Sequence, residues 1–145
     1  MNLSKNFTLN EFVFSPTAIR CRIDNTPNSD SIANMKLLCE NVIQVIRDKF
    51  GVVRISSGFR CPKLNSRVKG SGTSQHVYGQ AADITLENMK EVFKYIQDNL
   101  EFDQLIWEYG TDESPAWIHV SYSKDRNRKE VLRKYKIGPY KKFKI

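Results

Sequence analysis

Apolar residues recur at alternating steps of three and four in the first third of the chain, and this pattern constrains the fold most. The stripe consists of Ile32, Met35, Cys39, Val42 and Ile46. Such spacing is typical of one face of an α-helix. Phe50-Gly51 closes the pattern, so it predicts a helix from about Ser31 to Lys49.

The remaining apolar segments alternate between strand and helix patterns. Strands are predicted for VVRIS (52–56), AADITL (81–86), QLIWEY (104–109) and AWIHVSY (116–122). A long polar loop (57–79) follows the first strand, and a second amphipathic helix (89–100) follows the next one. This order predicts an α+β fold with a small antiparallel sheet and two main amphipathic helices around a cleft.

Length and composition indicate a single folded unit. The chain has 145 residues, of which 40% are hydrophobic, so we expect one domain over residues 1–145. No apolar run reaches the roughly 18 residues of a transmembrane helix, and the N-terminus lacks the pattern of a signal peptide. We therefore expect synthesis in the cytoplasm. Three widely spaced cysteines without a C-x-x-C pair are expected to be free thiols.

Positive charge is concentrated at the C-terminus. Residues 121–145 contain ten basic and two acidic residues, whereas the whole chain carries a net charge of +7. The basic segment from about residue 123 predicts attraction to polyanions, with an anionic bacterial envelope as the candidate partner. Nucleic acid is not favoured, because the segment has few aromatic residues and no recognisable binding motif. A solvated end without a partner is the alternative.

The chain has only two histidines, and His76 lies seven residues before Asp83 in the stretch SQHVYGQAADI. The other, His119, lies on the predicted strand 116–122, where alternation places it opposite the apolar side of Ile118 and Val120. Two histidines and one carboxylate leave a fourth tetrahedral position free, as in catalytic zinc sites. We expect one Zn²⁺ per chain at His76, Asp83 and His119, although manganese and cobalt also accept such ligands.

These residues also carry a resemblance to a known family. SQHVYGQAAD (74–83) matches the S-x-H-x-x-G-x-A-x-D motif of the zinc D-Ala-D-Ala carboxypeptidase-like peptidases of the M15 type. WIHVSY (117–122) resembles the strand that supplies the last histidine of that family. The opening NFTLNEFVFSPTA (6–18) is similar to the start of small phage and bacterial members. The resemblance covers most of residues 6–122 and implies that the cleft of the α+β domain holds zinc.

The resemblance implies two substrate-binding residues. Arg60, in the segment SGFR, resembles an arginine that holds the carboxylate of the substrate through a bidentate pair. Alternatively, Arg60 anchors its loop to Asp83 or another acid. Ser74 resembles a serine that helps to hold substrate, and a turn or capping role is its alternative.

The catalytic base departs from a common pattern of the family. Many members have an acid three residues before the last histidine, and that position is Ala116 here. The candidates are Glu108, at the end of a predicted strand, and Asp112 or Glu113 in the following loop. We favour Glu108, because a strand end fixes a side chain better than a loop does. The run FDQLIWE also resembles the strand that carries the corresponding glutamate in the hedgehog signalling domain, a relative of this fold.

The resemblance implies a zinc metallopeptidase that hydrolyses a peptide bond involving D-amino acids in bacterial peptidoglycan. The sequence leaves D,D-carboxypeptidase and endopeptidase cleavage open. A basic tail without a signal peptide fits a phage endolysin that acts on the cell wall after release, and a cytosolic dipeptidase is an alternative. Another alternative is a non-catalytic, zinc-containing module that binds the cell wall. We expect a monomer.

Overall fold

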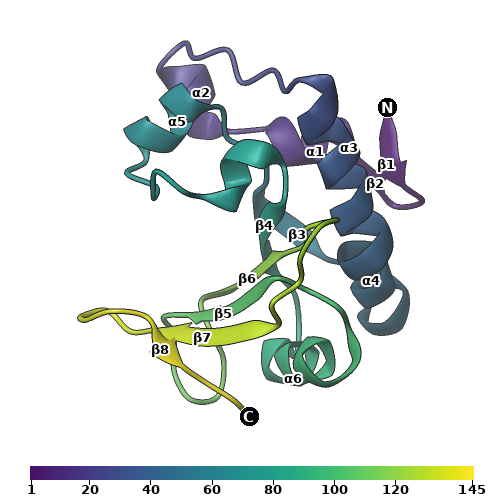
Figure 1. Ribbon diagram of the computed structural model, residues 1–145, viewed down its shortest axis with the longest axis vertical. Coiled ribbons are helices and arrows are strands. Elements are labelled where there is room, and N and C mark those ends of the chain that lie inside the picture. Colours follow the sequence, from purple (N-terminus) through teal and green to yellow (C-terminus); the bar gives the residue numbers. More distant parts are fainter.

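The computed structural model describes residues 1–145 as a layered arrangement of helices and sheet. In chain order the elements are β1 (Asn2–Ser4), β2 (Phe7–Thr8), α1 (Leu9–Val13), α2 (Pro16–Arg20), α3 (Ser29–Leu38), η1 (Cys39–Ile43), α4 (Gln44–Phe50), β3 (Arg54–Ser57), α5 (Pro62–Arg67), η2 (Gln75–Tyr78), β4 (Ala81–Thr85), α6 (Met89–Asn99), β5 (Gln104–Glu108), β6 (Trp117–Ser121), β7 (Glu130–Lys134) and β8 (Lys141–Lys142). The predicted α+β class is confirmed. Figure 1 shows α1, α2 and α5 gathered at one end of the molecule and the β7–β8 turn projecting from the sheet.

The main sheet has six strands in the order β3-β4-β6-β5-β7-β8, and β1 and β2 form a separate pair. Neighbouring strands are antiparallel except for β5 and β7, which are parallel. The antiparallel prediction therefore holds for the four strands from β3 to β5, and the sheet as a whole is mixed. The reason is the connection between β6 and β7, which carries the chain past β5 so that β7 runs in the same direction as β5.

One face of the sheet packs against both main helices. The core includes Ile84 from β4, Trp107 from β5, and Ile118 from β6, each fully buried. Phe93 of α6 meets Trp107 edge to face, with ring centroids 5.3 Å apart. The stripe of the first helix joins the same cluster of buried residues. Since alternate strand residues point to opposite sides, the other face of the sheet is left free for polar groups.

The first predicted helix exists and is longer than expected. It runs through α3, η1 and α4, from Ser29 to Phe50. Asn28 caps its start by accepting a hydrogen bond from the Ser31 backbone N–H at 2.8 Å. Gly51, with φ of 93°, ends it. The middle turn, η1, is a π-helix, which inserts an extra residue into the helical ladder.

The sequence predicts a long loop for the segment 57–79, but this segment also contains two short helices, α5 and η2. Both helices are short and lack an apolar stripe, so periodicity did not reveal them. Local capping forms them instead. Cys61 Sγ caps α5, which begins with Pro62, and Ser74 Oγ caps η2. The opening segment, for which no periodic pattern predicted an element, likewise forms β1, β2, α1 and α2, with Thr8 and Ser15 as caps.

The C-terminal segment adds a strand, β7, to the sheet, and this strand contains the apolar residues Val131 and Leu132. Both lie in β7, next to β5. Tyr135 and Ile137 lie beyond the strand and are exposed. All three cysteines are free. None of the helices combines the length and the apolar character needed to cross a membrane.

Candidate metal centre and substrate cleft

The register of the central strands brings Asp83 and His119 together. They are direct partners in the antiparallel pairing of β4 and β6. Directly opposed residues on neighbouring strands project to the same face, with their Cβ atoms about 5 Å apart. Asp83 Oδ1 lies 3.0 Å from His119 Nδ1. As the sequence pattern predicted, this face is the one opposite Ile118 and the apolar core.

His76 reaches the same point from η2. Its turn begins at Ser74, whose Oγ accepts from the His76 backbone N–H at 3.2 Å. The turn ends at Gly79, which has φ of 73°, and a Cβ there would lie 2.4 Å from the Ser31 carbonyl oxygen. Only glycine fits this position, because both the backbone angle and the space exclude a side chain. The chain is thus turned from His76 directly into β4.

The three residues form a compact group of potential ligand atoms. One ligand atom from each of His76, Asp83 and His119 lies within 4.8 Å of the others. His76 Nδ1 lies 2.7 Å from the carbonyl oxygen of Gly58, so Nδ1 carries the hydrogen of this contact. That leaves His76 Nε2, 3.4 Å from Asp83 Oδ1, with a free lone pair. A hydrogen-bonded imidazole with its other nitrogen free is the usual state of a metal-binding histidine.

The electrostatics of the group favour the protonation states that ligands need. Burial lowers the pKa of His76, which outweighs the opposing effect of Asp83 and keeps the imidazole neutral at neutral pH. Burial by itself would raise the pKa of Asp83, but the hydrogen bond from His119 Nδ1 helps to hold it below its usual range, so the carboxylate stays ionised. Neutral nitrogen and ionised oxygen donors suit a divalent cation. The residues present therefore fit a metal ion.

The group lies in a cleft of about 730 Å³. Its lining includes Arg60, Ser74 and Glu108 in addition to the three potential ligands. The structure thus brings all six site residues predicted from the sequence to one cavity. Polar side chains predominate in this lining, which suits a polar substrate such as a peptide.

Glu108 ends β5 on the cleft side of the sheet. Its partner on β6 is Trp117, two residues before His119. The side chain is only 7% exposed. Burial is the main cause that raises the pKa of Glu108, and the charge of Asp83 adds to it. The backbone N–H of Ala116 donates to the carbonyl oxygen of Glu108 at 2.9 Å, so Glu108 lies beside the position where many family members carry their acid.

The two alternative acids are engaged elsewhere. Asp112 accepts from Arg133 Nη1 at 2.7 Å, and Glu113 lies 3.8 Å from Lys90 Nζ. Both carboxylate side chains are 86% exposed. Neither residue lines the cleft. Of the three candidate acids, only Glu108 lines the cavity that contains the metal group.

Arg60 has no carboxylate partner among the ion pairs of the structure. Its Nη2 approaches Ser74 Oγ at 3.4 Å, and its Nε is buried without a hydrogen-bond partner. Burial lowers the pKa of Arg60, and the charge of Asp83 opposes this effect. A partly buried guanidinium with an unused donor is suited to binding an anion from outside. Ser74 caps η2, which was the alternative reading of that residue.

No sequence pattern indicated the buried network around Asp103, next to His76. Asp103 is 2% exposed and accepts from Arg128 Nε at 2.8 Å and Nη2 at 3.0 Å. It also accepts from Nε2 of Gln75, the residue before His76, at 2.9 Å. The network ties η2 to the sheet and to the β6–β7 loop. Its members are 28 and 25 residues apart in sequence, so no local motif links them.

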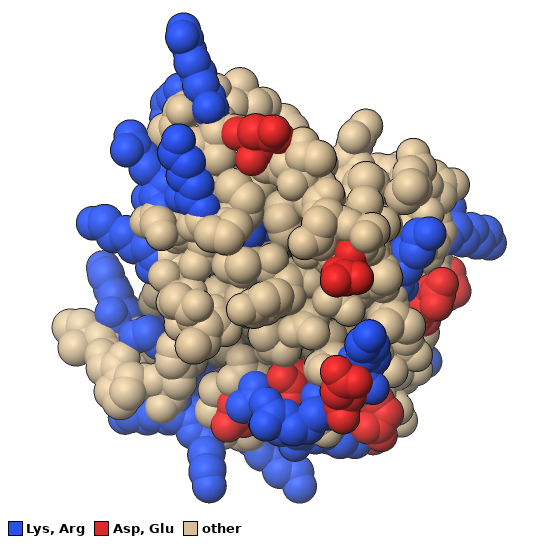
Figure 2. Space-filling view, turned by 45° about the horizontal axis from the view of Figure 1, so that its top comes forward, with Lys and Arg blue, Asp and Glu red and all other residues tan.

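Basic residues surround the cleft more closely than the sequence indicated. Lys69, Arg126 and Arg128 lie on its lining together with Arg60. Figure 2 shows Lys and Arg side chains along the left and lower margins of the molecule, around a middle that carries little charge. The tail also provides Tyr140 to the lining. The C-terminal segment is therefore part of the cavity. The sequence indicated only that this basic segment attracts polyanions.

A comparison with known families covers most of the chain. A family model described as Peptidase M15 matches residues 5–121. The matched range contains the three potential ligands, Arg60, Ser74 and Glu108, and it ends before the C-terminal segment. No curated protein matches the sequence significantly. The resemblance drawn from the sequence motifs is thus confirmed over most of the chain.

Proposed function

The chain belongs to the peptidase M15 family, and on this premise we propose that it is a zinc-dependent peptidase that cleaves a D-amino-acid-containing peptide bond of bacterial peptidoglycan. The observation that carries the proposal is the convergence of His76, Asp83 and His119 in a cleft that also contains a buried carboxylate and a partly buried guanidinium without a carboxylate partner. The family gives the class of reaction. The contents of the cleft support the roles proposed below for the individual side chains.

In this proposal one Zn²⁺ is held by His76, Asp83 and His119. Two nitrogen donors and one oxygen donor leave a coordination position for water, which distinguishes a catalytic from a structural site. When bound, zinc supplies an activated water at neutral pH and a positive charge that polarises the scissile carbonyl. Gly58 supports the site by fixing the tautomer of His76 through its carbonyl oxygen.

Glu108 serves as the general base. A base in this position accepts a proton from the attacking water and returns it to the amine that leaves. Burial raises the pKa of Glu108, which makes it a better proton acceptor than an ordinary glutamate. Because Glu108 ends a strand that is paired on both sides, its backbone is held in place.

Arg60 and Ser74 bind the substrate in this scheme. The buried Nε of Arg60 has no protein partner, and a carboxylate of the peptide would satisfy it together with the Nη groups. The Oγ of Ser74 lies between Arg60 and the start of η2. The basic C-terminal segment adds attraction to an anionic envelope, where the substrate is found. A phage endolysin that reaches the wall after release would combine the proposed cleavage of peptidoglycan with this basic segment.

The test is digestion of purified peptidoglycan, with mass spectrometry of the released muropeptides and zinc analysis of the same sample. Turnover that depends on zinc and yields a defined cut between D-amino acids supports the proposal. The mass of the product distinguishes removal of a terminal residue from cleavage of a cross-link. A protein that carries one zinc, binds the wall and releases nothing is a binding module, and the proposed catalysis is then wrong.

A further inference from the structure

The C-terminal segment, residues 122–145, lies outside the family match yet contributes to the cleft. Its lining residues are Ser123, Arg126, Arg128, Leu132 and Tyr140. We propose that Tyr140 is a substrate-positioning residue that contacts the peptide beside Glu108. This inference rests on the proposed function, and it assigns to the tail a role in binding substrate at the cleft in addition to attraction.

Strand pairing connects Tyr140 to Glu108. In the parallel pairing of β5 and β7, Glu108 is the partner of Lys134. The next residue, Tyr109, donates its backbone N–H to the carbonyl oxygen of Lys134 at 2.8 Å. Lys134 Nζ in turn lies 5.7 Å from the ring centroid of Tyr140. Lys134 is therefore both the strand partner of Glu108 and a neighbour of Tyr140, and Glu108 and Tyr140 both line the cleft.

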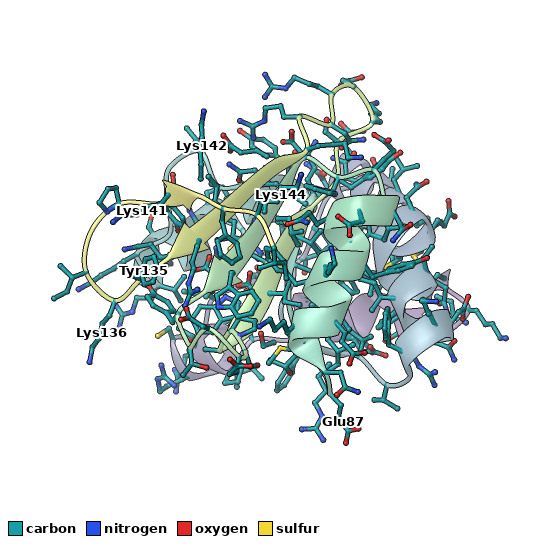
Figure 3. All side chains as sticks on the ribbon, turned by 90° about the horizontal axis from the view of Figure 1, so that it is seen from below. Glu87, Tyr135, Lys136, Lys141, Lys142 and Lys144 are labelled. Carbon is teal, nitrogen blue, oxygen red and sulfur yellow. The ribbon has the colours of Figure 1, made fainter.

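The turn that carries Tyr140 is fixed to the sheet. Lys134 Nζ donates to the carbonyl oxygen of Tyr135 at 3.1 Å and also to that of Gly138. Pairing of β7 with β8 brings the chain back immediately after Tyr140. In Figure 3 the labelled Tyr135, Lys136 and Lys141 surround this turn. A ring held in this way can define one wall of the cleft, since its backbone does not need to be ordered by the ligand.

The chemistry of a phenol suits a peptide ligand. The side chain of Tyr140 is 51% exposed, so it offers an apolar ring face and a hydroxyl that can donate to a peptide carbonyl. Burial is the first cause that raises the pKa of Tyr140, and the charge of Glu108 is the next. The hydroxyl therefore remains protonated, and hence a donor, at neutral pH.

Tyr135 offers a matched control on the same turn. It is 43% exposed, similar to Tyr140. The Cζ of Arg133 lies 4.5 Å from the centroid of the Tyr135 ring. Tyr135 does not line the cleft. Tyr135→Phe therefore removes one hydroxyl from the same turn at a residue that does not line the cleft.

The experiment compares Tyr140→Phe, Tyr140→Ala and Tyr135→Phe on a small soluble muropeptide. Loss of one hydrogen bond predicts a KM about 3- to 10-fold higher for Tyr140→Phe, with kcat within about twofold. Tyr140→Ala also loses the ring, and a rise of about 10- to 100-fold in KM is expected. Zinc content stays at one per chain in every variant. Tyr135→Phe behaves as wild type.

The proposal is overturned if KM of Tyr140→Phe stays within about 1.5-fold of wild type, or if Tyr135→Phe shifts KM equally. Should Tyr140→Ala not fold, Tyr140→Phe decides, because it keeps the ring. A wild-type protein that binds the peptide without cleaving it contradicts the proposed function alone. The ratio of Kd between wild type and Tyr140→Phe, measured by calorimetry with that peptide, then decides the role of Tyr140.

Discussion

The central strands and the C-terminal edge of one sheet carry different kinds of chemistry. β4, β6 and β5 hold Asp83, His119 and Glu108 in a partly or fully buried row, each fixed by pairing on both sides. β7 and the edge strand β8 lie in a segment rich in exposed lysines (Figure 3). Side chains that must be positioned to within about an ångström need the rigid centre of a sheet. Charges that act over a Debye length do not need such precise positions.

The two regions are nevertheless joined at the cleft. Arg128 of the tail neutralises Asp103 behind η2, and Lys134 pairs in register with Glu108. The tail residues that line the cavity differ in this respect from those that only project into solvent. The predictions below ask which residues belong to the fixed centre and which act by charge alone.

The largest effect is expected from the metal group. Replacement of His76, Asp83 or His119 by Ala removes one of three donors, so stoichiometric zinc and peptidase activity should be lost together. Metal analysis by mass spectrometry and a peptidoglycan assay on the same preparation measure both. Asp125→Ala, on an exposed loop, serves as control. A triple variant that still holds one equivalent of zinc would refute the assignment of the ligands.

The next effect separates chemistry from metal binding within the centre. Glu108→Ala should lower kcat by about 10²- to 10⁴-fold, the usual contribution of a general base, while zinc is retained. Because the pKa of Glu108 is raised, kcat of the wild type should fall with acidification at a higher pH than for an ordinary glutamate. Asp112→Ala and Glu113→Ala are matched controls. If either of them shows the loss and Glu108→Ala does not, the base lies in the loop.

A smaller effect tests the link between the two regions. Asp103→Asn leaves Arg128 and Gln75 with a weaker acceptor, so the free energy of unfolding should fall by about 1–3 kcal/mol in urea titrations. Burial by itself would raise the pKa of Asp103, but the hydrogen bonds from Arg128 outweigh it and hold this pKa below its unfolded value. Its stabilisation is therefore present above about pH 4 and is lost as pH falls through the lower, folded value.

The wild type should accordingly lose this part of its stability in acid, whereas Asp103→Asn should show a flatter dependence on pH. Asp125→Asn, on the loop between β6 and β7, is the control and should change the unfolding free energy by less than about 0.5 kcal/mol. Metal-free protein is used throughout, since zinc release in acid would mask the difference. Equal acid sensitivity of Asp103→Asn and wild type would show that the network does not contribute.

The smallest effect concerns the edge. Charge-neutral substitutions are placed at the exposed tail residues Lys136, Lys141, Lys142 and Lys144. Lysis of whole envelopes at low ionic strength should slow several-fold, while turnover of a small soluble peptide stays within about twofold. Lys134 is left out of this set, although its charge alone would include it, because it supports Tyr140 beside Glu108. If the neutralised protein lyses envelopes at the wild-type rate at low salt, the tail is only a solvated end.

The sequence by itself determined the parts that depend on local patterns. The apolar stripe from Ile32 to Ile46 specified the long helix, and alternation along 116–122 placed His119 on the face opposite the core. The motif from Ser74 to Asp83 identified the family. Each of these signals lies within one segment of about ten to twenty residues, where periodicity and spacing are set by backbone geometry.

Only the tertiary structure decided which distant residues share the cleft. The parallel pairing of β7 with β5 sets Lys134 against Glu108, and the return through β8 adds Tyr140. Asp103 likewise bonds to Gln75 and Arg128, which are 28 and 25 residues away in the sequence. Contacts of this kind depend on strand order and register, which are fixed by the burial of the whole sheet face rather than by any short segment. In the sequence, the basic C-terminal segment is separate from the predicted site residues. In the fold, it forms part of the wall of the cleft.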